Sequence, residues 1–289
     1  MTKILNKLIN KYSGKNFLHT SPHPDDVTLG YLPYINWLLN TSKNEHYFLT
    51  MTSGSNAVRD SDLIKFLELY KINKSSIDIN QVNNIDFLKG LVREHEEESV
   101  WTSLGIPNKN IIHFRAKFYS QKLQDLSNDI EVLYKLLLDI NPDILTVAID
   151  PKGVGPETHY KTFLVVQGAV NNFFNKTGKN IEIIGYRNVW CQFEIEQVNL
   201  YFPVEQSDFD LLYKTFINSY LSQVDAMFPN NNYSGNFAEI AIAIMQDNLK
   251  KFINKFGLII PESDPGSSNI KGLCFLKTMN IKEFLNLKL

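Results

Sequence analysis

Three side chains that could bind a metal or move a proton stand close together near the start of the chain: His23, Asp25 and Asp26. They follow residues 17–21, an apolar stretch that predicts a strand, and open α/β sheets bind ligands beyond the carboxyl ends of their strands. Imidazole and carboxylate groups are suitable ligands for zinc and similar divalent metals. Two adjacent carboxylates seldom point at one atom, so one can bind a metal while the other stays free as a base. The alternative is structural, because an Asp pair after a Pro turn can also cap a helix.

A second cluster, DPKGVGPETH at residues 150–159, follows the apolar residues 143–149. His159 falls in the predicted first turn of a helix, where it can reach a site shared with His23. A single His at such a place is more often structural, but two strand ends that each carry a His favour a shared metal site. Gly153 and Gly155 precede the N-terminus of this helix, where free backbone N–H groups favour the binding of an anion. The spacing of these glycines does not complete a GxGxxG or P-loop motif.

The elements that must position these groups alternate between strands and helices. Apolar runs predict strands at residues 17–21, 47–52, 111–114, 143–149 and 181–186. Helical spacing of apolar residues predicts helices at residues 30–40, 62–70, 85–104, 121–140 and 158–176, and the Asn-rich composition predicts a surface loop at residues 73–84. This alternation predicts an α/β fold, with a mainly parallel sheet and helices on both faces.

The pattern changes after residue 198, where helices are predicted at residues 207–223 and 235–256, followed by a short apolar stretch at residues 272–276. No repeat or linker stands out. We therefore expect a single domain over residues 1–289, with a core at about residues 15–190 and a C-terminal helical extension at about residues 198–289.

The composition is that of an ordinary globular protein, with 289 residues and a formal net charge of −2. The electrostatic field of so small a net charge gives no reason to expect nucleic acid as a partner. No apolar run approaches the ~20 residues that a membrane span needs. The N-terminus lacks the apolar core of a secretory signal. Cys191 and Cys274 lie far apart, which excludes a disulfide framework and a Cys-based zinc site. We expect a cytoplasmic protein with a small-molecule partner. The sequence leaves the oligomeric state open, and a homo-oligomer is one alternative.

The segment SPHPDDVTLG resembles the (A/S)-H-P-D-D motif of the PIG-L (LmbE-like) family of zinc-dependent de-N-acetylases. Longer segments, REHEEESVW and FPNNNYSGNFAEIA among them, are similar to the LmbE-like domain that some bacteria carry behind glucosamine-6-phosphate deaminase. The resemblance covers roughly residues 15–285 and implies a Rossmann-like three-layer sandwich. It continues in three shorter matches: Arg93 with Glu96, Thr158 with His159, and Ser222 with Gln223.

The resemblance also implies a role for each matching residue. His23, Asp26 and His159 would be the metal ligands, with zinc as the expected metal and another divalent ion as the alternative. Asp25 would be the general base for attack of a zinc-bound water on an N-acetyl carbonyl. Two residues would bind or brace the sugar, Arg93 and Glu96.

The chain departs from the family pattern at the second metal motif. Pro156 stands where many members have a His that assists the tetrahedral intermediate, and Thr158 stands where they have an Asp. We hypothesise that Asp150 or Glu157 compensates for the missing His. Residues 52–55, Thr-Ser-Gly-Ser, replace the usual Thr-Asp-Gly-Glu, which indicates a changed substrate contact.

The remaining histidines have structural interpretations. His19 and His113 lie in predicted strands and are expected in the core or behind the site. His46 is expected in a polar turn, and His95 on the surface or the pocket rim.

The predicted function is removal of the N-acetyl group from an N-acetylglucosamine-type amino sugar or conjugate by a zinc-dependent hydrolase. The absence of a His at Pro156 motivates an alternative, a catalytically weakened sugar-binding or regulatory module of the same fold. A further alternative is an amidase that acts on a non-sugar substrate.

Overall fold

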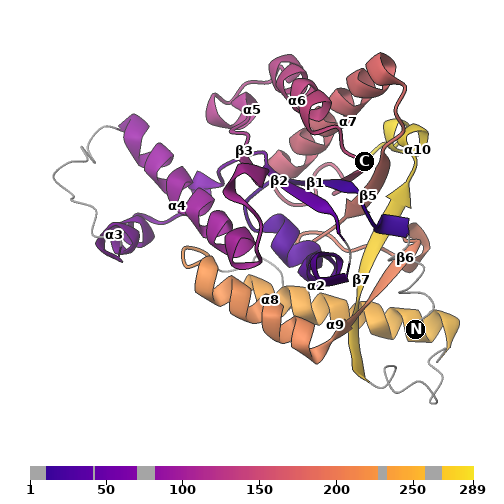
Figure 1. Cartoon of the computed structure of the whole chain (residues 1–289). Helices are drawn as coiled ribbons and strands as arrows, with labels where there is room; N and C mark the ends of the chain where they lie inside the picture. Colours follow the sequence, from indigo (N-terminus) through magenta and orange to yellow (C-terminus); the bar gives the residue numbers. More distant parts are fainter. Residues whose placement is uncertain (1–10, 42, 70–81, 227–232, 258–268) are drawn as a thin grey trace.

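Five parallel strands form most of the sheet in the computed structural model, which describes residues 11–41, 43–69, 82–226, 233–257 and 269–289 (Figure 1). They are β1 (Asn16–Ser21), β2 (Glu45–Thr50), β3 (Ile111–His113), β4 (Ile144–Ala148) and β5 (Glu182–Tyr186). Two antiparallel strands follow, β6 (Leu200–Glu205) and β7 (Ile270–Met279). Within the described residues the seven strands form one sheet of order β3-β2-β1-β4-β5-β7-β6. The predicted α/β fold with a mainly parallel sheet is confirmed.

Helices cover both faces of this sheet (Figure 1). One face carries α2 (Asp26–Thr41), α4 (Val82–Ser103), α8 (Gln206–Ser219) and α9 (Phe237–Phe256), and α3 (Asp60–Leu69) packs on α4. The opposite face carries α6 (Ser127–Ile140), α7 (Glu157–Thr177) and α10 (Ile281–Leu285), and the short helix α5 (Lys117–Ser120) precedes α6. Each face has its own apolar core, so the architecture is a three-layer sandwich. Short 3-10 turns lie at Ser55–Ala57, Asn108–Asn110 and Ile195–Gln197.

The strand β4 shows why the central strands are apolar along their whole length. Successive side chains of a strand point to opposite faces of the sheet. Leu145 and Val147 accordingly pack against the α6–α7 layer, while Ile144 and Ala148 pack against the α2 layer. Because both faces are covered, all five residues of β4 are buried.

The order of the strands reverses between β1 and β4. From β1 the chain proceeds outward through β2 and β3, whereas β4 lies on the other side of β1 and leads outward to β5. A crevice therefore opens at the carboxyl ends of β1 and β4, where α/β sheets commonly bind ligands. The two polar clusters of the sequence follow these two strands.

The predicted helix at residues 121–140 is wrong in its first part. α5 ends at Ser120 and α6 begins at Ser127, and Lys122 between them has a left-handed φ of 52°. The Asp125 carboxylate accepts hydrogen bonds from the backbone N–H and the hydroxyl of Ser127. Such local side-chain hydrogen bonds offer the backbone an alternative to the helix.

The sequence also predicts no strand at residues 200–205, where β6 forms the edge of the sheet. Pro203 lies inside β6, and proline is tolerated there because an edge strand pairs on one side only. His46 was expected in a turn but is buried in β2, which begins at Glu45. Most of the predicted loop at residues 73–84 lies outside the described residues, and α4 begins at Val82. None of the helices described here is both long and apolar enough to cross a membrane.

Candidate metal centre

Three side chains from the two strand ends converge on one point, as their ligand atoms show. His23 Nδ1 lies 3.2 Å from Asp26 Oδ2, and His159 Nε2 lies 3.3 Å from the same oxygen. The two ring nitrogens are 3.2 Å apart. Zinc–nitrogen and zinc–oxygen bonds of about 2.0–2.1 Å in a tetrahedral site separate neighbouring ligand atoms by about 3.3–3.4 Å. The triangle of donor atoms therefore fits a zinc-sized ion, with a fourth position left open.

His159 is held in place from behind by Asp150. Its Nδ1 atom lies 2.6 Å from Asp150 Oδ2, and both side chains are fully buried. An N–H donated to the carboxylate leaves the Nε2 lone pair directed at the centre, the usual arrangement behind a metal-binding histidine. Burial alone would lower the pKa of His159, but Asp26 and Asp150 outweigh it and raise the pKa to about 10.

His23 comes from the turn after β1, and Thr158 in the first turn of α7 contacts its far side. Thr158 Oγ1 lies 3.0 Å from His23 Nε2. If Nε2 carries the proton and donates it to this hydroxyl, Nδ1 is left unprotonated and faces the other two ligands. The residue that departs from the family pattern thus orients a candidate ligand.

Asp26 is the first residue of α2 and uses its two oxygens differently. Oδ2 accepts the backbone N–H of His23 at 2.7 Å and faces both histidines. Oδ1 accepts a hydrogen bond of 2.5 Å from the side-chain amide of Asn188, in the loop after β5. Burial alone would raise the pKa of Asp26, but the two histidines hold it well below its ordinary value. Sequence reasoning missed Asn188, and its place beyond the end of a central strand was the available signal.

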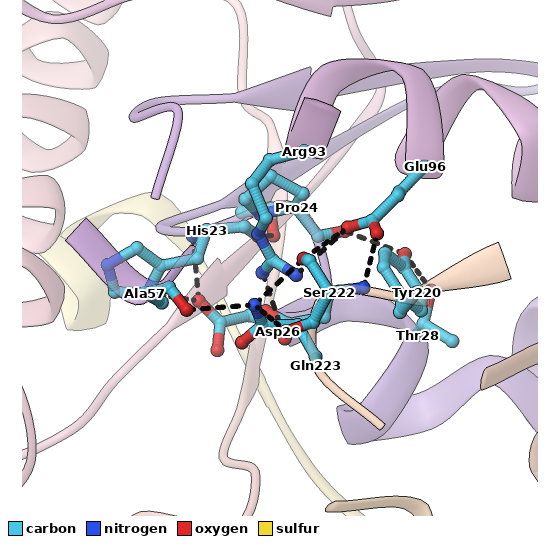
Figure 2. Close-up of polar contacts among 12 residues, drawn as sticks. His23, Pro24, Asp26, Thr28, Ala57, Arg93, Glu96, Tyr220, Ser222 and Gln223 are labelled. Carbon is cyan, nitrogen blue, oxygen red and sulfur yellow. Dashed lines mark hydrogen bonds and ion pairs between the residues drawn. The ribbon is translucent and has the colours of Figure 1, made fainter. Parts of the chain in front are cut away.

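Asp25 is buried beside this centre and pairs with Arg93 rather than with the histidines. Arg93 Nη2 lies 3.0 Å from Asp25 Oδ2. Arg93 Nη1 lies 3.4 Å from Glu96 Oε2 (Figure 2). Glu96 in turn accepts hydrogen bonds from the backbone N–H of Ser222 at 2.7 Å and from its hydroxyl at 2.8 Å. Burial alone would lower the pKa of Arg93, but the two carboxylates raise it above its ordinary value. The chain thus places a permanent cation against Asp25.

A cleft of about 720 Å³ opens over these residues. Arg93 lies in its wall, together with all of the candidate site except His159 and Glu96. The carboxylate of Glu96 is engaged on the far side of Arg93, so within the described residues it braces Arg93 instead of facing the cleft. Other parts of the wall come from residues 54–57, 118–124, 156–161 and 189–190, and from Leu29, Gln223, Ala226 and Phe237.

The two residues that we expected to compensate for the missing His lie in different surroundings. Asp150 is sealed behind His159 and does not line the cleft. Glu157 lines the mouth of the cleft, but its side chain is 74% exposed and pairs with Lys161 at 3.3 Å. Asp150 therefore serves as a support for the ring of His159, and Glu157 lies at the entrance.

The other histidines lie away from this centre. His19 and His46 are buried side by side, with His19 Nε2 3.0 Å from His46 Nδ1. His113 contacts Glu98 at 3.1 Å. His95 contacts the ring of Phe66 edge-on.

The model of a family described as PIG-L, GlcNAc-PI de-N-acetylase, matches residues 18–170, which include both strand ends and all three candidate ligands. A curated glucosamine-6-phosphate deaminase-like protein of Bacteroides thetaiotaomicron is 26% identical over 225 residues. That match covers 65% of this chain but 33% of the relative, so the chain spans about a third of the relative's length.

Three solved structures share the fold. The N,N'-diacetylchitobiose deacetylase of Pyrococcus horikoshii gives a TM-score of 0.60 at 16% identity, with 98% of this chain and 94% of that chain covered. The 4-carboxy-2-hydroxymuconate hydratase of Pseudomonas putida gives 0.56 at 12% identity, covering 92% and 96%. The zinc-inhibited form of a teicoplanin deacetylase gives 0.52 at 10% identity, covering 91% and 97%. At these identities the likeness establishes the fold alone, and the hydratase among them shows that this fold supports more than one reaction.

Proposed function

The chain belongs to the PIG-L (GlcNAc-PI de-N-acetylase) family, and we propose that it is a metal-dependent hydrolase that removes the N-acetyl group from an N-acetylglucosamine-type amino sugar or a conjugate of one. The observation that carries the proposal is the triangle of His23, Asp26 and His159, with edges of 3.2–3.3 Å, at a cleft that His23, Asp25 and Asp26 line. Three protein ligands with an open position are typical of hydrolytic zinc sites.

Zinc bound at these three atoms would polarise the acetamide carbonyl and lower the pKa of a water molecule at the open position. The chain itself supplies the proton acceptor. Asp25 offers Oδ1, since its other oxygen is held by Arg93 at 3.0 Å. The fixed guanidinium orients this carboxylate, and general-base catalysis requires such positioning.

Hydrolysis of the amide also requires a proton for the departing amine. Asp150 is enclosed behind His159, and Glu157 points to solvent, so neither faces the amide. We assign this step to Asp25 as well, which would take the proton from water at Oδ1 and return it to the amine nitrogen as the C–N bond breaks. One residue then serves as base and acid, and the balance of protons closes without the His that Pro156 replaces.

The test is acetate release by the zinc-loaded protein from a panel of N-acetylglucosamine derivatives, together with its metal content. The Asp25→Asn variant should keep its zinc and lose about 100-fold or more of the turnover. The matched control is Asp210→Asn, the same exchange at an exposed position of α8, which should leave turnover unchanged. Wild-type protein with zinc bound and no acetate released from any derivative would refute the proposal.

Pro156 gives a specific reason to consider a second function, a sugar-binding module on the same fold. The panel separates the two, because a binding module would bind an N-acetylated sugar at equilibrium without releasing acetate. An amidase for non-sugar substrates would show the reverse, with acetate released from simple N-acetyl amines and none from the sugars.

A further inference from the structure

The charged and ligating groups deep in the cleft are engaged with one another. Asp25 pairs with Arg93, and Asp26 lies between His23 and His159. These groups are buried and held in fixed positions by their partners. The charges available to the distal part of a substrate are therefore those at the mouth of the cleft, where the wall carries two lysines and Glu157.

Lys161 is the first of these lysines, and α7 sets its position. It follows Thr158 by three residues, so it lies on the same face of the helix about 4.5 Å further along the axis. Because Thr158 contacts His23, Lys161 lies further along α7 from the candidate metal centre than Thr158 does. Its side chain is only 15% exposed. The side chain of its partner Glu157 is 74% exposed, and Glu157 Oε1 lies 3.3 Å from Lys161 Nζ. Exposed i,i+4 ion pairs are weak, so Glu157 can give way to an anion that enters the cleft.

Lys122 and Tyr119 supply another part of the wall, from α5 and the residues after it. Lys122 has no ion-pair partner within the described residues, and it adopts a left-handed φ of 52° that costs energy for a residue other than glycine. The Tyr119 hydroxyl accepts the backbone N–H of Asn56 at 3.3 Å, so its own proton is available to a ligand. Two ammonium groups and one hydroxyl donor thus border the same cleft, with no acidic group among residues 118–124.

Resting on the proposed function, we infer that the substrate carries an anionic group in addition to its acetamide, and that Lys161, Lys122 and Tyr119 bind this group. Phosphate and carboxylate share the required chemistry, since both accept several charge-assisted hydrogen bonds. The volume of about 720 Å³ lies within the range of sites that enclose ligands larger than one sugar ring. The lysines therefore select an acidic amino sugar over a neutral one.

The test compares kcat/KM for neutral N-acetylglucosamine with three acidic probes: its 6-phosphate, its 1-phosphate and N-acetylmuramic acid. At least one acidic probe should be preferred roughly 10-fold or more, and the best one tells phosphate from carboxylate and gives its position. Lys161→Gln and Lys122→Gln should each reduce this preference about 10-fold, while Lys161→Arg should retain most of it. The preference should also shrink as salt rises from 0.05 to 0.5 M, because salt screens charges at the mouth of a cleft.

The matched control is Lys152→Gln, since Lys152 is exposed, lies 5.7 Å from the Tyr160 ring centroid and does not line the cleft. It should leave the preference unchanged. A preference near one in the wild type, or a preference that survives the Lys161→Gln, Lys122→Gln double variant, overturns the inference. Thermal melting of each variant confirms that it is folded.

Equilibrium binding separates this inference from the proposed function. Calorimetry on the zinc-loaded protein compares glucosamine 6-phosphate, glucosamine 1-phosphate and muramic acid with glucosamine, none of which carries an acetyl group. Tighter binding of an acidic sugar that depends on Lys161 supports the inference even where no acetate is released. Equal acetate release from neutral and acidic sugars, with equal binding, refutes the anionic site and leaves the deacetylase standing.

Discussion

Arg93 holds Asp25 through an ion pair of 3.0 Å in which the guanidinium is almost fully buried, with 2% of its side chain exposed. The same guanidinium reaches Glu96, which is fixed by Ser222 from the other end of the chain. One buried cation thus serves two buried carboxylates. This arrangement orients Asp25 toward the cleft and ties the turn after β1 to α4 and to the residue pair that follows α8.

Replacing Arg93 with Met should be costly, because it leaves two carboxylates buried without a cation. Removal of one partner from a buried ion pair typically costs about 3–5 kcal/mol. We expect a loss of this size in the free energy of unfolding, measured by urea titration at pH 7. The control is Arg59→Met, whose side chain is 51% exposed and pairs with Asp62, and which should destabilise the protein much less than Arg93→Met. A loss below about 1 kcal/mol for Arg93→Met would show that this pair does not hold the site together.

Replacing Thr158 with Val should weaken metal binding. The exchange removes the hydroxyl that lies 3.0 Å from His23 Nε2 and leaves the shape of the side chain unchanged. Loss of such a supporting contact typically costs 10–100-fold in metal affinity. Competition with a chelating dye measures the effect on zinc affinity, and Thr158→Ser should keep most of it.

Thr162→Val is the matched control for this prediction. It makes the same exchange one turn further along α7, at a buried hydroxyl with no hydrogen-bond partner among the described residues. Zinc affinity should not change there. An equal loss of affinity in both variants would mean that the effect comes from α7 as a whole and not from His23.

The sequence was sufficient to locate the strand ends that carry the candidate site. The metal-ligating residue types and the predicted strand ends both pointed to the same two segments of the chain. His23, Asp26 and His159 are polar groups at the ends of two apolar runs, and their convergence needs only that β1 and β4 be neighbours. The supporting contacts were harder to foresee. Asn188 and Ser222 look like ordinary loop residues, and the bond from Ser222 to Glu96 joins positions 126 residues apart.

The missed elements have a similar physical origin. Residues 121–126 fit a helical pattern, but Asp125 captures the backbone of Ser127 and the helix starts there instead. The edge strand β6 contains Pro203, which argues against a strand until it is known that one side has no partner. The hydrogen bonds of Asp125 and the edge position of β6 decide the structure at these two places. Neither can be read from the periodicity of apolar residues.

The buried pair of His19 and His46 should make stability depend on pH in the mildly acidic range. Burial lowers the pKa of His46 to about 4 and that of His19 well below its ordinary value. Between pH 6.5 and 4 the unfolded chain therefore binds protons that the folded chain does not, so stability falls as the pH falls. The difference in free energy of unfolding between wild type and His46→Asn should shrink by about 1.4 kcal/mol per pH unit in this window. A difference that stays constant from pH 7 to pH 4.5 would show that His46 titrates normally in the folded protein.

Glu97 should give the opposite dependence at higher pH. Burial raises its pKa to about 8, although Thr50 and Trp101 both donate hydrogen bonds to Oε1. Oε2 has no hydrogen-bond partner within the described residues, and His113 Nδ1 lies 3.5 Å from it. Between pH 4.5 and 8 the folded chain holds one proton that the unfolded chain has lost, so stability falls as the pH rises toward 8 and levels off above it.

Glu97→Gln isolates this effect, because Gln matches the neutral acid in shape and does not titrate. The free energy of unfolding of wild type relative to Glu97→Gln should fall by about 1.4 kcal/mol per pH unit between pH 5 and 8. Glu98→Gln is the matched control, since the Glu98 side chain is 44% exposed and its exchange should change this slope little. Because Glu97 follows Glu96 on α4, a charge there adds a third carboxylate near the single cation Arg93. A flat difference across this range would mean that Glu97 is ionised at neutral pH and that Arg93 is shared among three carboxylates.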